Sequence, residues 1–220
     1  MKLYSFPLSP YAARVRGAIY AKDLAVEMIL PPEDWRTSDA FRAVNPLRRI
    51  PVLVLDDGTT VAESQVIVEY LEDAHPETPL RPTTAEARAR VRFVTQIAET
   101  YVMGALMPLF GMFDAKTKDA GAIDLQLAKL DSALANLEAA LSPKGYAHGD
   151  RLSTADVFLA PLRFSLDGLM GFSGRNGLLD RHPRIAGYGD VVQGDRALSR
   201  VWSEMTDGLR SFYEKRASAG

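Results

Sequence analysis

The stretch that decides the fold is Arg49-Ile50-Pro51-Val52-Leu53, followed by Asp57-Gly58 and then by Glu63-Ser64. This order predicts a strand, a tight turn, a second strand and a helix, because apolar runs flank an Asp-Gly turn signal. The proline donates no hydrogen bond to a sheet and leaves the backbone beside it available to a ligand. Ser64 is a preferred N-cap residue, and helix N-termini attract anions. The stretch therefore predicts an open strand edge beside an anion site, which suits an extended peptide with a free carboxylate.

These residues resemble the cytosolic glutathione S-transferases, in which a Lys/Arg-Val/Ile-Pro-Val-Leu run and a later Glu/Gln-Ser pair hold the tripeptide glutathione. The resemblance implies a cis proline, a backbone pairing of the preceding residue with the cysteinyl unit, and binding of the γ-glutamyl end by the acid-serine pair. It thereby assigns glutathione binding to Arg49, Ile50, Pro51, Glu63 and Ser64. The plain alternative is a core strand followed by a helix cap.

Composition places the 220-residue chain among ordinary globular proteins, with 47% hydrophobic and 25% charged residues. A net charge of −2 gives no basic surface for nucleic acid. No apolar run approaches the roughly 18 residues that span a membrane. The absence of cysteine excludes disulfides, zinc-thiolate sites and a thiol nucleophile, and the three histidines lack metal-ligand spacing. We expect a cytoplasmic protein with no metal, nucleic-acid or membrane partner.

A proline-rich segment, residues 76–84, predicts a linker between two domains. Strand and helix signals alternate before it in the order β-α-β then β-β-α, which predicts a thioredoxin-like domain over 1–75. Strand signals stop after it, and an all-helical domain is expected over 85–220. The fold class is therefore α/β plus all-α, and the resemblance implies that the first domain binds glutathione while the second lines the site of an electrophile.

Two helices of the second domain have clear signals. A long helix is expected over 84–113, with Pro108 bending or splitting it. Five leucines spaced three and four residues apart predict an amphipathic helix; they are Leu127, Leu130, Leu134, Leu137 and Leu141. Ser153-Thr154-Ala155-Asp156 has the form of a capping box. The segment 149–160, GDRLSTADVFLA, resembles the Ser/Thr-x-x-Asp motif of the transferases, and we expect Asp156 to serve folding rather than chemistry.

Ser9-Pro10 predicts the N-cap and first turn of a helix that continues through Arg14 and Arg16. A hydroxyl donor at a helix N-terminus stabilises a thiolate, whereas a free thiol with a pKa of about 8.5 stays mostly protonated at neutral pH. Serine-type transferases (tau, theta, zeta) carry a serine in this place, and the resemblance implies that Ser9 is the catalytic residue. The alternatives are a simple helix cap at Ser9 and a sulfur contact from Tyr4. The two arginines are expected at a dimer cleft or in solvent.

Methionine and phenylalanine recur at helical spacing around residues 103–113, which by itself favours a core. The resemblance implies that this helix lines an apolar electrophile pocket, and we expect Tyr11, Met107 and Phe110 to form it. Tyr11 stands where the zeta kind has a cysteine, which argues against maleylacetoacetate isomerase activity.

The resemblance implies a homodimeric glutathione transferase of detoxification that conjugates glutathione, its co-substrate, to an apolar electrophile without a bound cofactor. One alternative is a glutathione-dependent isomerase or dehalogenase of a catabolic pathway. The other is a binding protein that keeps the fold without catalysis.

Overall fold

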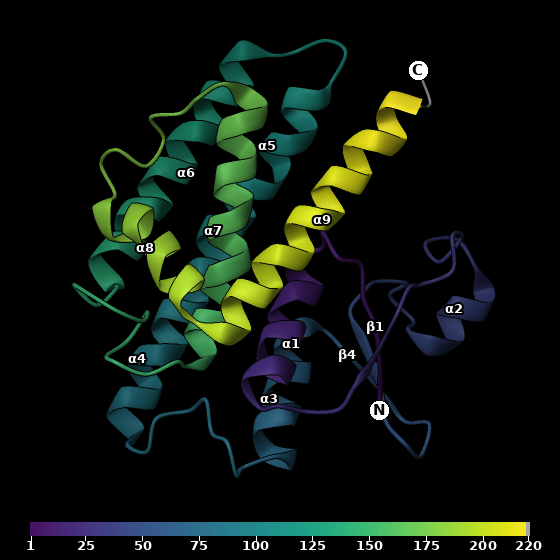
Figure 1. Cartoon of the computed structure of the whole chain (residues 1–220). Coiled ribbons are helices and arrows are strands. Elements are labelled where there is room, and N and C mark those ends of the chain that lie inside the picture. Colours follow the sequence, from purple (N-terminus) through teal and green to yellow (C-terminus); the bar gives the residue numbers. More distant parts are fainter. Residues whose placement is uncertain (219–220) are drawn as a thin grey trace. The chain divides into compact units, whose positions relative to one another are not determined.

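The computed structural model describes residues 1–218 and divides into two compact units (Figure 1). The first unit contains Met1–Leu80 together with the segment that begins at Asp195, and the second contains Arg81–Gly194. The sequence predicted a helical domain that extends to residue 220. The structure instead groups the last helix, α9 (Arg196–Ser218), with the first unit.

The first unit is built on a four-stranded mixed sheet with the strand order β2-β1-β3-β4. Its strands are β1 (Lys2–Tyr4), β2 (Glu27–Ile29), β3 (Val52–Val54) and β4 (Thr60–Ala62). Its helices before the linker are α1 (Pro10–Ala21), α2 (Asp39–Val44) and α3 (Ser64–Ala74). β1 and β2 are parallel, whereas β3 is antiparallel to both β1 and β4. This arrangement confirms the predicted thioredoxin-like fold.

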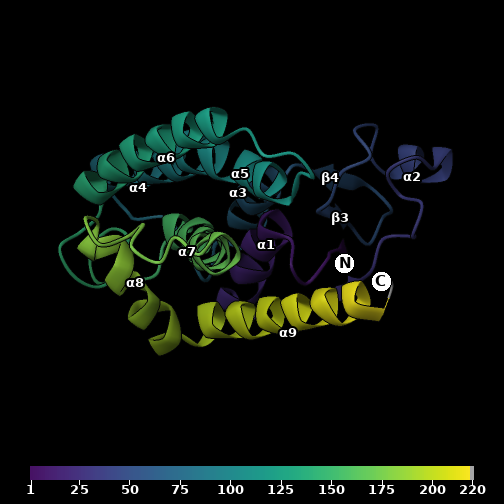
Figure 2. The same cartoon turned by 90° about the horizontal axis from the view of Figure 1, so that it is seen from above.

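Burial of apolar side chains explains how the helices of the first unit are held. Leu53 on β3 and Ile67 on α3 are fully buried, and α3 packs on β3 and β4 as well as on α1. The amphipathic helix α9 packs its apolar stripe on α1, and Figure 2 shows the two helices side by side. Four buried residues form that stripe: Ala197, Leu198, Val201 and Met205.

A buried ion pair fixes the end of the first unit. Lys22 Nζ lies 2.7 Å from Glu72 Oε1, and the two side chains are 1% and 2% exposed. Lys22 also donates hydrogen bonds of 2.8 Å to the carbonyl oxygens of His75 and Thr78. Glu72 accepts from the backbone N–H of Leu80. The pair therefore ties the segment after α3 to the helices of the first unit.

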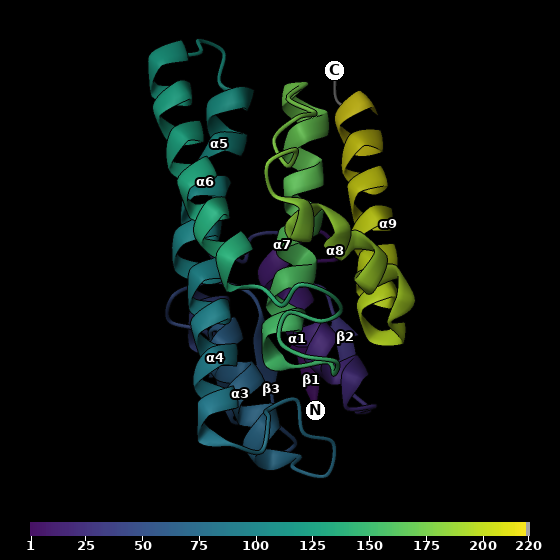
Figure 3. The same cartoon turned by 90° about the vertical axis from the view of Figure 1, so that its left-hand side faces the viewer.

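The second unit is helical throughout its described elements, as predicted. They are α4 (Ala85–Gln96), the π-helical segment η1 (Ile97–Met103), α5 (Gly104–Asp114), α6 (Ala120–Ala140), α7 (Thr154–Ser173) and α8 (Pro183–Gly194). Figure 3 shows α6 alongside α4 and α5. The predicted leucines on α6 face the core, with Leu130, Leu134 and Leu137 fully buried.

Of the two effects predicted for Pro108, bending or splitting the first long helix, the structure excludes the splitting. Pro108 lies inside α5, and the helical run is continuous from residue 85 to 114. The departure from α-helical geometry is η1, upstream of the proline. By length and composition alone this run could cross a membrane, but half of its most apolar window is buried inside the protein. It packs against α6 and α7 of the same unit, as the core helix of a globular domain does.

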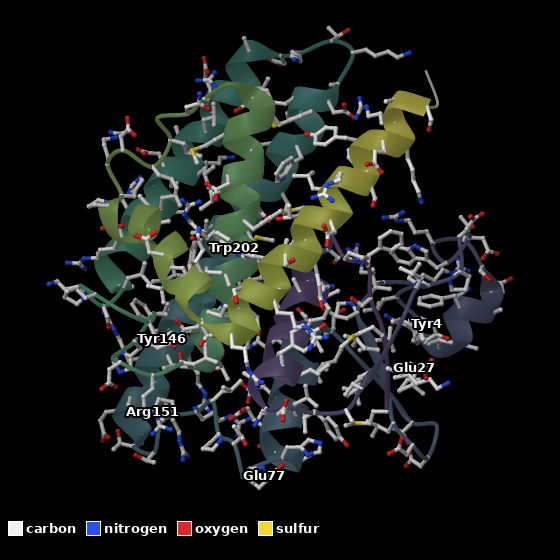
Figure 4. The ribbon with its side chains drawn as sticks, in the orientation of Figure 1. Tyr4, Glu27, Glu77, Tyr146, Arg151 and Trp202 are labelled. Carbon is white, nitrogen blue, oxygen red and sulfur yellow. The ribbon has the colours of Figure 1, made fainter. Side chains whose placement is uncertain are left out.

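The predicted capping box of α7 is confirmed. Asp156 is completely buried and accepts hydrogen bonds from the backbone N–H groups of Ala147 at 2.6 Å and Ser153 at 2.8 Å. The hydroxyls of Ser153 and Tyr188 donate to it as well, at 2.8 and 2.6 Å. Burial raises the pKa of Asp156, and the four hydrogen bonds oppose this rise. Asp156 thus joins α7 to α8 and to the loop before α7, which Tyr146 and Arg151 mark in Figure 4.

Candidate active site

The register of the sheet brings the predicted glutathione residues to one end of three neighbouring strands. Tyr4, the last residue of β1, pairs with Val52, the first residue of β3. Val52 in turn pairs with Ala62, the last residue of β4. Three predicted parts of the site therefore lie at the same end of the sheet. The loop to Ser9 follows β1, the Ile50-Pro51 bond precedes β3, and the Glu63-Ser64 pair follows β4.

Ser9 is the N-cap of α1. Its Oγ accepts a hydrogen bond of 3.2 Å from the backbone N–H of Ala12, and its own N–H donates to the carbonyl oxygen of Phe6. A serine hydroxyl carries one donor and two acceptor positions. The cap uses an acceptor position and leaves the hydroxyl proton for another partner. The cap and the sulfur contact, which the sequence presented as alternatives, are therefore compatible in one conformation.

The Ile50-Pro51 peptide bond is cis, as the resemblance implied. Ile50 packs against a small apolar cluster made of Trp35, Phe41 and Val52. Pro51 is buried directly before β3. The Arg49 side chain is exposed, while its carbonyl oxygen accepts a 2.8 Å hydrogen bond from the side-chain amide of Asn45. This bond fixes the backbone that leads into the cis proline.

Glu63 and Ser64 begin α3, but the cap differs from the one that the sequence predicted. Glu63 occupies the N-cap position, with a φ of 69°, and Ser64 is the first helical residue. A left-handed backbone at a residue other than glycine costs about 1–3 kcal/mol and is concentrated at functional sites. Ser64 is buried and accepts a hydrogen bond of 3.4 Å from Arg14.

Arg14 and Arg16 are the residues that sequence reasoning misplaced. They are 1% and 2% exposed, whereas solvent or a dimer cleft was expected. The Arg14 guanidinium carbon lies 4.7 Å from the centre of the Tyr11 ring and its Nη1 reaches Ser64, so this cation connects the starts of α1 and α3. Two charged residues inside the otherwise apolar run from Ala12 to Ala18 were the signal for burial. Two helix N-termini and a buried arginine make this end of the sheet favourable for an anion.

Tyr4 lies within β1, and its ring packs edge-on against Phe41 of α2, with 5.3 Å between the ring centres. Trp35 packs on the same phenylalanine. Figure 4 labels Tyr4 on β1 and Glu27 on the neighbouring strand β2, where Glu27 pairs with Lys2 and Tyr4 pairs with Ile29. The structure thus gives Tyr4 a packing role against α2.

The three residues predicted for the electrophile pocket belong to different units. Tyr11 is half-buried on α1 of the first unit. Met107 and Phe110 are half-buried on α5 of the second unit, where Phe110 packs against Phe172 of α7 with 6.4 Å between ring centres. Their assembly into one pocket stays a prediction. Within residues 1–218, no group of three or more histidine, aspartate or glutamate side chains lies in position to hold a metal ion.

Comparisons with known proteins agree with this geometry. Residues 3–79 match the family model of the glutathione S-transferase N-terminal domain, and residues 120–188 match that of the C-terminal domain. Glutathione S-transferase Z2 of Arabidopsis thaliana is 36% identical over 173 residues, which cover 73% of this chain and 74% of that protein. Maleylacetoacetate isomerase of Pseudomonas aeruginosa is 30% identical over 204 residues, which cover 87% of this chain and 91% of that protein.

Among solved structures, a glutathione S-transferase of Methylobacterium radiotolerans in complex with glutathione sulfonate superposes with a TM-score of 0.76 and 25% identity. The match covers 91% of this chain and 93% of that one. The sequence and structural matches extend over both units. The chain belongs to the glutathione S-transferase family.

Proposed function

We propose that this transferase activates glutathione through the Ser9 hydroxyl and transfers the resulting thiolate to an apolar electrophile. The observation that carries the proposal is the geometry of Ser9. Its Oγ caps α1 through an acceptor position, and its proton is left to donate at the end of the sheet where the cis proline and Ser64 also lie. A hydroxyl in this place donates to the sulfur without giving up the helix cap.

The energies are sufficient for such activation. A shift of two units from the usual thiol pKa of about 8.5 requires about 2.7 kcal/mol. A hydrogen bond to a charged group contributes about 1.5–3 kcal/mol, and a helix N-terminus adds about 0.3–1 kcal/mol. The two sources together account for a thiol that is ionised at neutral pH. Ser9 itself is no nucleophile, because none of its hydrogen-bond partners is a base.

Glutathione binding rests on the residues around Ser9. We assign Arg49 and Ile50 to the cysteinyl and glycyl end, where the cis Ile50-Pro51 bond leads into β3. Glu63 and Ser64 receive the γ-glutamyl end, and the Arg14 guanidinium behind Ser64 favours its carboxylate. Tyr11, Met107 and Phe110 are assigned to the electrophile, because their apolar side chains suit an adaptable pocket.

We further propose that the protein acts as a cytoplasmic homodimer with glutathione as co-substrate and no bound cofactor. Exposed apolar side chains support an interface: Phe93, Tyr101 and Leu125 are 51%, 58% and 60% exposed on α4, η1 and α6 of the second unit. Tyr101 and Leu125 line a hollow of about 720 Å³ on that unit. Clustered apolar exposure of this kind marks interaction surfaces. Sedimentation at equilibrium tests the dimer, and a monomer at micromolar concentration contradicts it.

A glutathione-dependent isomerase is the second candidate. The match to the Pseudomonas aeruginosa maleylacetoacetate isomerase over nearly the whole of both chains favours it. Tyr11, in the place of a cysteine of the zeta kind, opposes it. Turnover of maleylacetoacetate without conjugation of an aromatic chloride would establish the isomerase, and the reverse pattern would establish the conjugating enzyme. Failure to bind immobilised glutathione would point to the non-catalytic alternative.

The decisive experiment is an ultraviolet titration of bound glutathione in the wild type, in Ser9→Ala and in Ser38→Ala. Ser38 caps α2 as Ser9 caps α1, by accepting from a backbone N–H three residues ahead, and it serves as the matched cap control. We expect thiolate absorbance well below pH 8.5 in the wild type and in Ser38→Ala, and a pKa about two units higher in Ser9→Ala. Equal titrations in all three proteins would reduce Ser9 to a cap.

A further inference from the structure

The last helix of the chain, α9, contacts the loop that carries Ser9 and the arginine that binds this loop. Residues 5–9 connect β1 to α1, and Arg16 reaches back from α1 to three of them. Its Nη1 donates to Ser5 Oγ at 2.7 Å and to the carbonyl oxygen of Phe6 at 3.0 Å. Its Nη2 donates to the carbonyl oxygen of Pro7 at 2.6 Å. One buried guanidinium therefore sets the path of the backbone that leads to Ser9.

Glu204 of α9 holds this guanidinium in place. Its Oε2 lies 2.8 Å from Arg16 Nε, and its Oε1 accepts a 2.7 Å hydrogen bond from the Tyr20 hydroxyl. Arg200, one turn earlier on α9, reaches the same carboxylate at 3.3 Å and lies over the Tyr20 ring. Both oxygens of Glu204 are thus engaged, and the carboxylate compensates the charge of a guanidinium that is 2% exposed.

Gly208, one turn further along α9, brings the helix backbone against the same loop. A Cβ atom at this position would lie 2.9 Å from the backbone nitrogen of Leu8 and 3.0 Å from Cβ of Pro7. Real Cβ atoms essentially never approach another atom as closely as 2.9 Å, and the backbone nitrogen of Leu8 cannot turn away as the end of a side chain can. α9 is therefore in direct contact with the residue before Ser9. Figure 4 labels Trp202 on this helix.

We infer that α9 is a positioning element of the active site, in which Glu204 acts through Arg16 and Gly208 acts through Pro7 and Leu8 to aim the Ser9 hydroxyl at the sulfur of glutathione. The inference rests on the proposed function of Ser9 and goes beyond it, because neither Glu204 nor Gly208 is among the residues assigned to glutathione or the electrophile. Hydrogen bonds weaken steeply with distance and angle. A displacement of a few tenths of an ångström at Leu8 therefore reaches Ser9 and reduces stabilisation of the thiolate.

Gly208→Ala is the direct test, and its readout is the pKa of bound glutathione in the ultraviolet titration. We expect a rise of about one unit, which for a wild-type pKa of about 6.5 lowers the thiolate fraction at pH 7 from roughly three quarters to roughly one quarter. We also expect kcat to fall while the KM for glutathione changes less. Gly187→Ala on α8 is the matched control, because a Cβ there meets no atom within 4 Å. That variant is expected to titrate as the wild type does.

The combination Ser9→Ala/Gly208→Ala separates positioning from general damage. If Gly208 acts through Ser9, the double variant has the same thiol pKa as Ser9→Ala alone. Additive shifts, or a wild-type pKa in folded Gly208→Ala, would overturn the inference while leaving Ser9 in its role. An unchanged pKa in Ser9→Ala would overturn both proposals together.

Glu204→Gln provides the second variant in case Gly208→Ala does not fold, as judged by circular dichroism. The amide keeps the size of the side chain and can still accept from Tyr20, but it removes the charge that faces Arg16. We expect a smaller rise of the thiol pKa in the same direction, which again disappears in the Ser9→Ala background. A folded Glu204→Gln protein with the wild-type thiol pKa would refute the role of α9.

Discussion

Replacing Asp156 by alanine is expected to destabilise the protein severely without altering the chemistry of glutathione. Asp156 accepts four hydrogen bonds while completely buried. Alanine removes all four acceptor contacts. The hydroxyls of Ser153 and Tyr188 can turn to other acceptors, but the backbone N–H groups of Ala147 and Ser153 cannot. Each buried donor that loses its acceptor costs about 1–3 kcal/mol.

Two such donors give a loss of about 2–6 kcal/mol, and the expected value is near 4 kcal/mol. That is a large part of the roughly 5–15 kcal/mol by which a domain is stable. A protein of this size loses about 2–4 °C in Tm for each kcal/mol, so the expected shift is roughly 8–16 °C. Asp156→Asn keeps the shape and one oxygen acceptor, and it is expected to lose less.

Urea unfolding and thermal melting of the wild type, Asp156→Ala and Asp119→Ala provide the assay. Asp119 is also a helix cap, at α6, but it is exposed and accepts from the backbone N–H of Ala122. Loss of a cap of this kind costs about 1 kcal/mol. A loss in Asp156→Ala no larger than that in Asp119→Ala would refute the reasoning. A shifted thiol pKa in a stable Asp156→Ala protein would refute it as well.

Three further outcomes are expected. Lys22→Met removes the cation that faces the buried Glu72 carboxylate and should lower the free energy of unfolding, measured in urea, by about 3–5 kcal/mol. A loss under 1 kcal/mol would contradict the burial of this ion pair. Burial and the hydrogen bond to Glu204 raise the pKa of Tyr20 to about 12. Because the folded state holds this proton more tightly than the unfolded state, the contribution of Tyr20 to stability is complete below about pH 10 and is lost as the pH rises towards 12. Urea midpoints across that range should fall less in Tyr20→Phe, and parallel curves would disprove the link. Met107→Ala should raise the KM for an apolar electrophile and leave the thiol pKa unchanged, and unaltered kinetics with every electrophile tested would remove Met107 from the pocket.

The sequence predicted those features that are encoded locally. Asp57-Gly58 between two apolar runs gives the β3–β4 hairpin, Ser9-Pro10 gives the start of α1, and Ser153 to Asp156 gives the capping box of α7. In each case the signal and its structural result lie within a few residues of each other. The site residues were assigned through the resemblance of these motifs to the glutathione S-transferases, and the register of the sheet places Val52 and Ala62 at the same end.

Features that depend on distant partners escaped prediction. Arg14 and Arg16 looked like surface charges because long cationic side chains are rarely buried, and the groups that compensate them, Ser64 and Glu204, lie far away in the sequence. The packing of α9 on α1 likewise joins segments that lie far apart in the sequence, and no local signal specifies it. The N-cap of α3 was misassigned by one residue, because the left-handed backbone of Glu63 has no signal in its side chain.

The division of the chain also has a consequence for synthesis on the ribosome. The first unit contains the earliest residues and the segment from Asp195 onward, with the second unit between them. At about 5–20 residues per second, the intervening stretch of roughly a hundred residues takes about 5–20 s to translate. Throughout that interval α1 lacks the helix that covers it. A nascent chain stalled before Asp195 is therefore expected to expose the apolar face of α1 to chaperones, although the sheet and its active-site residues have already been made.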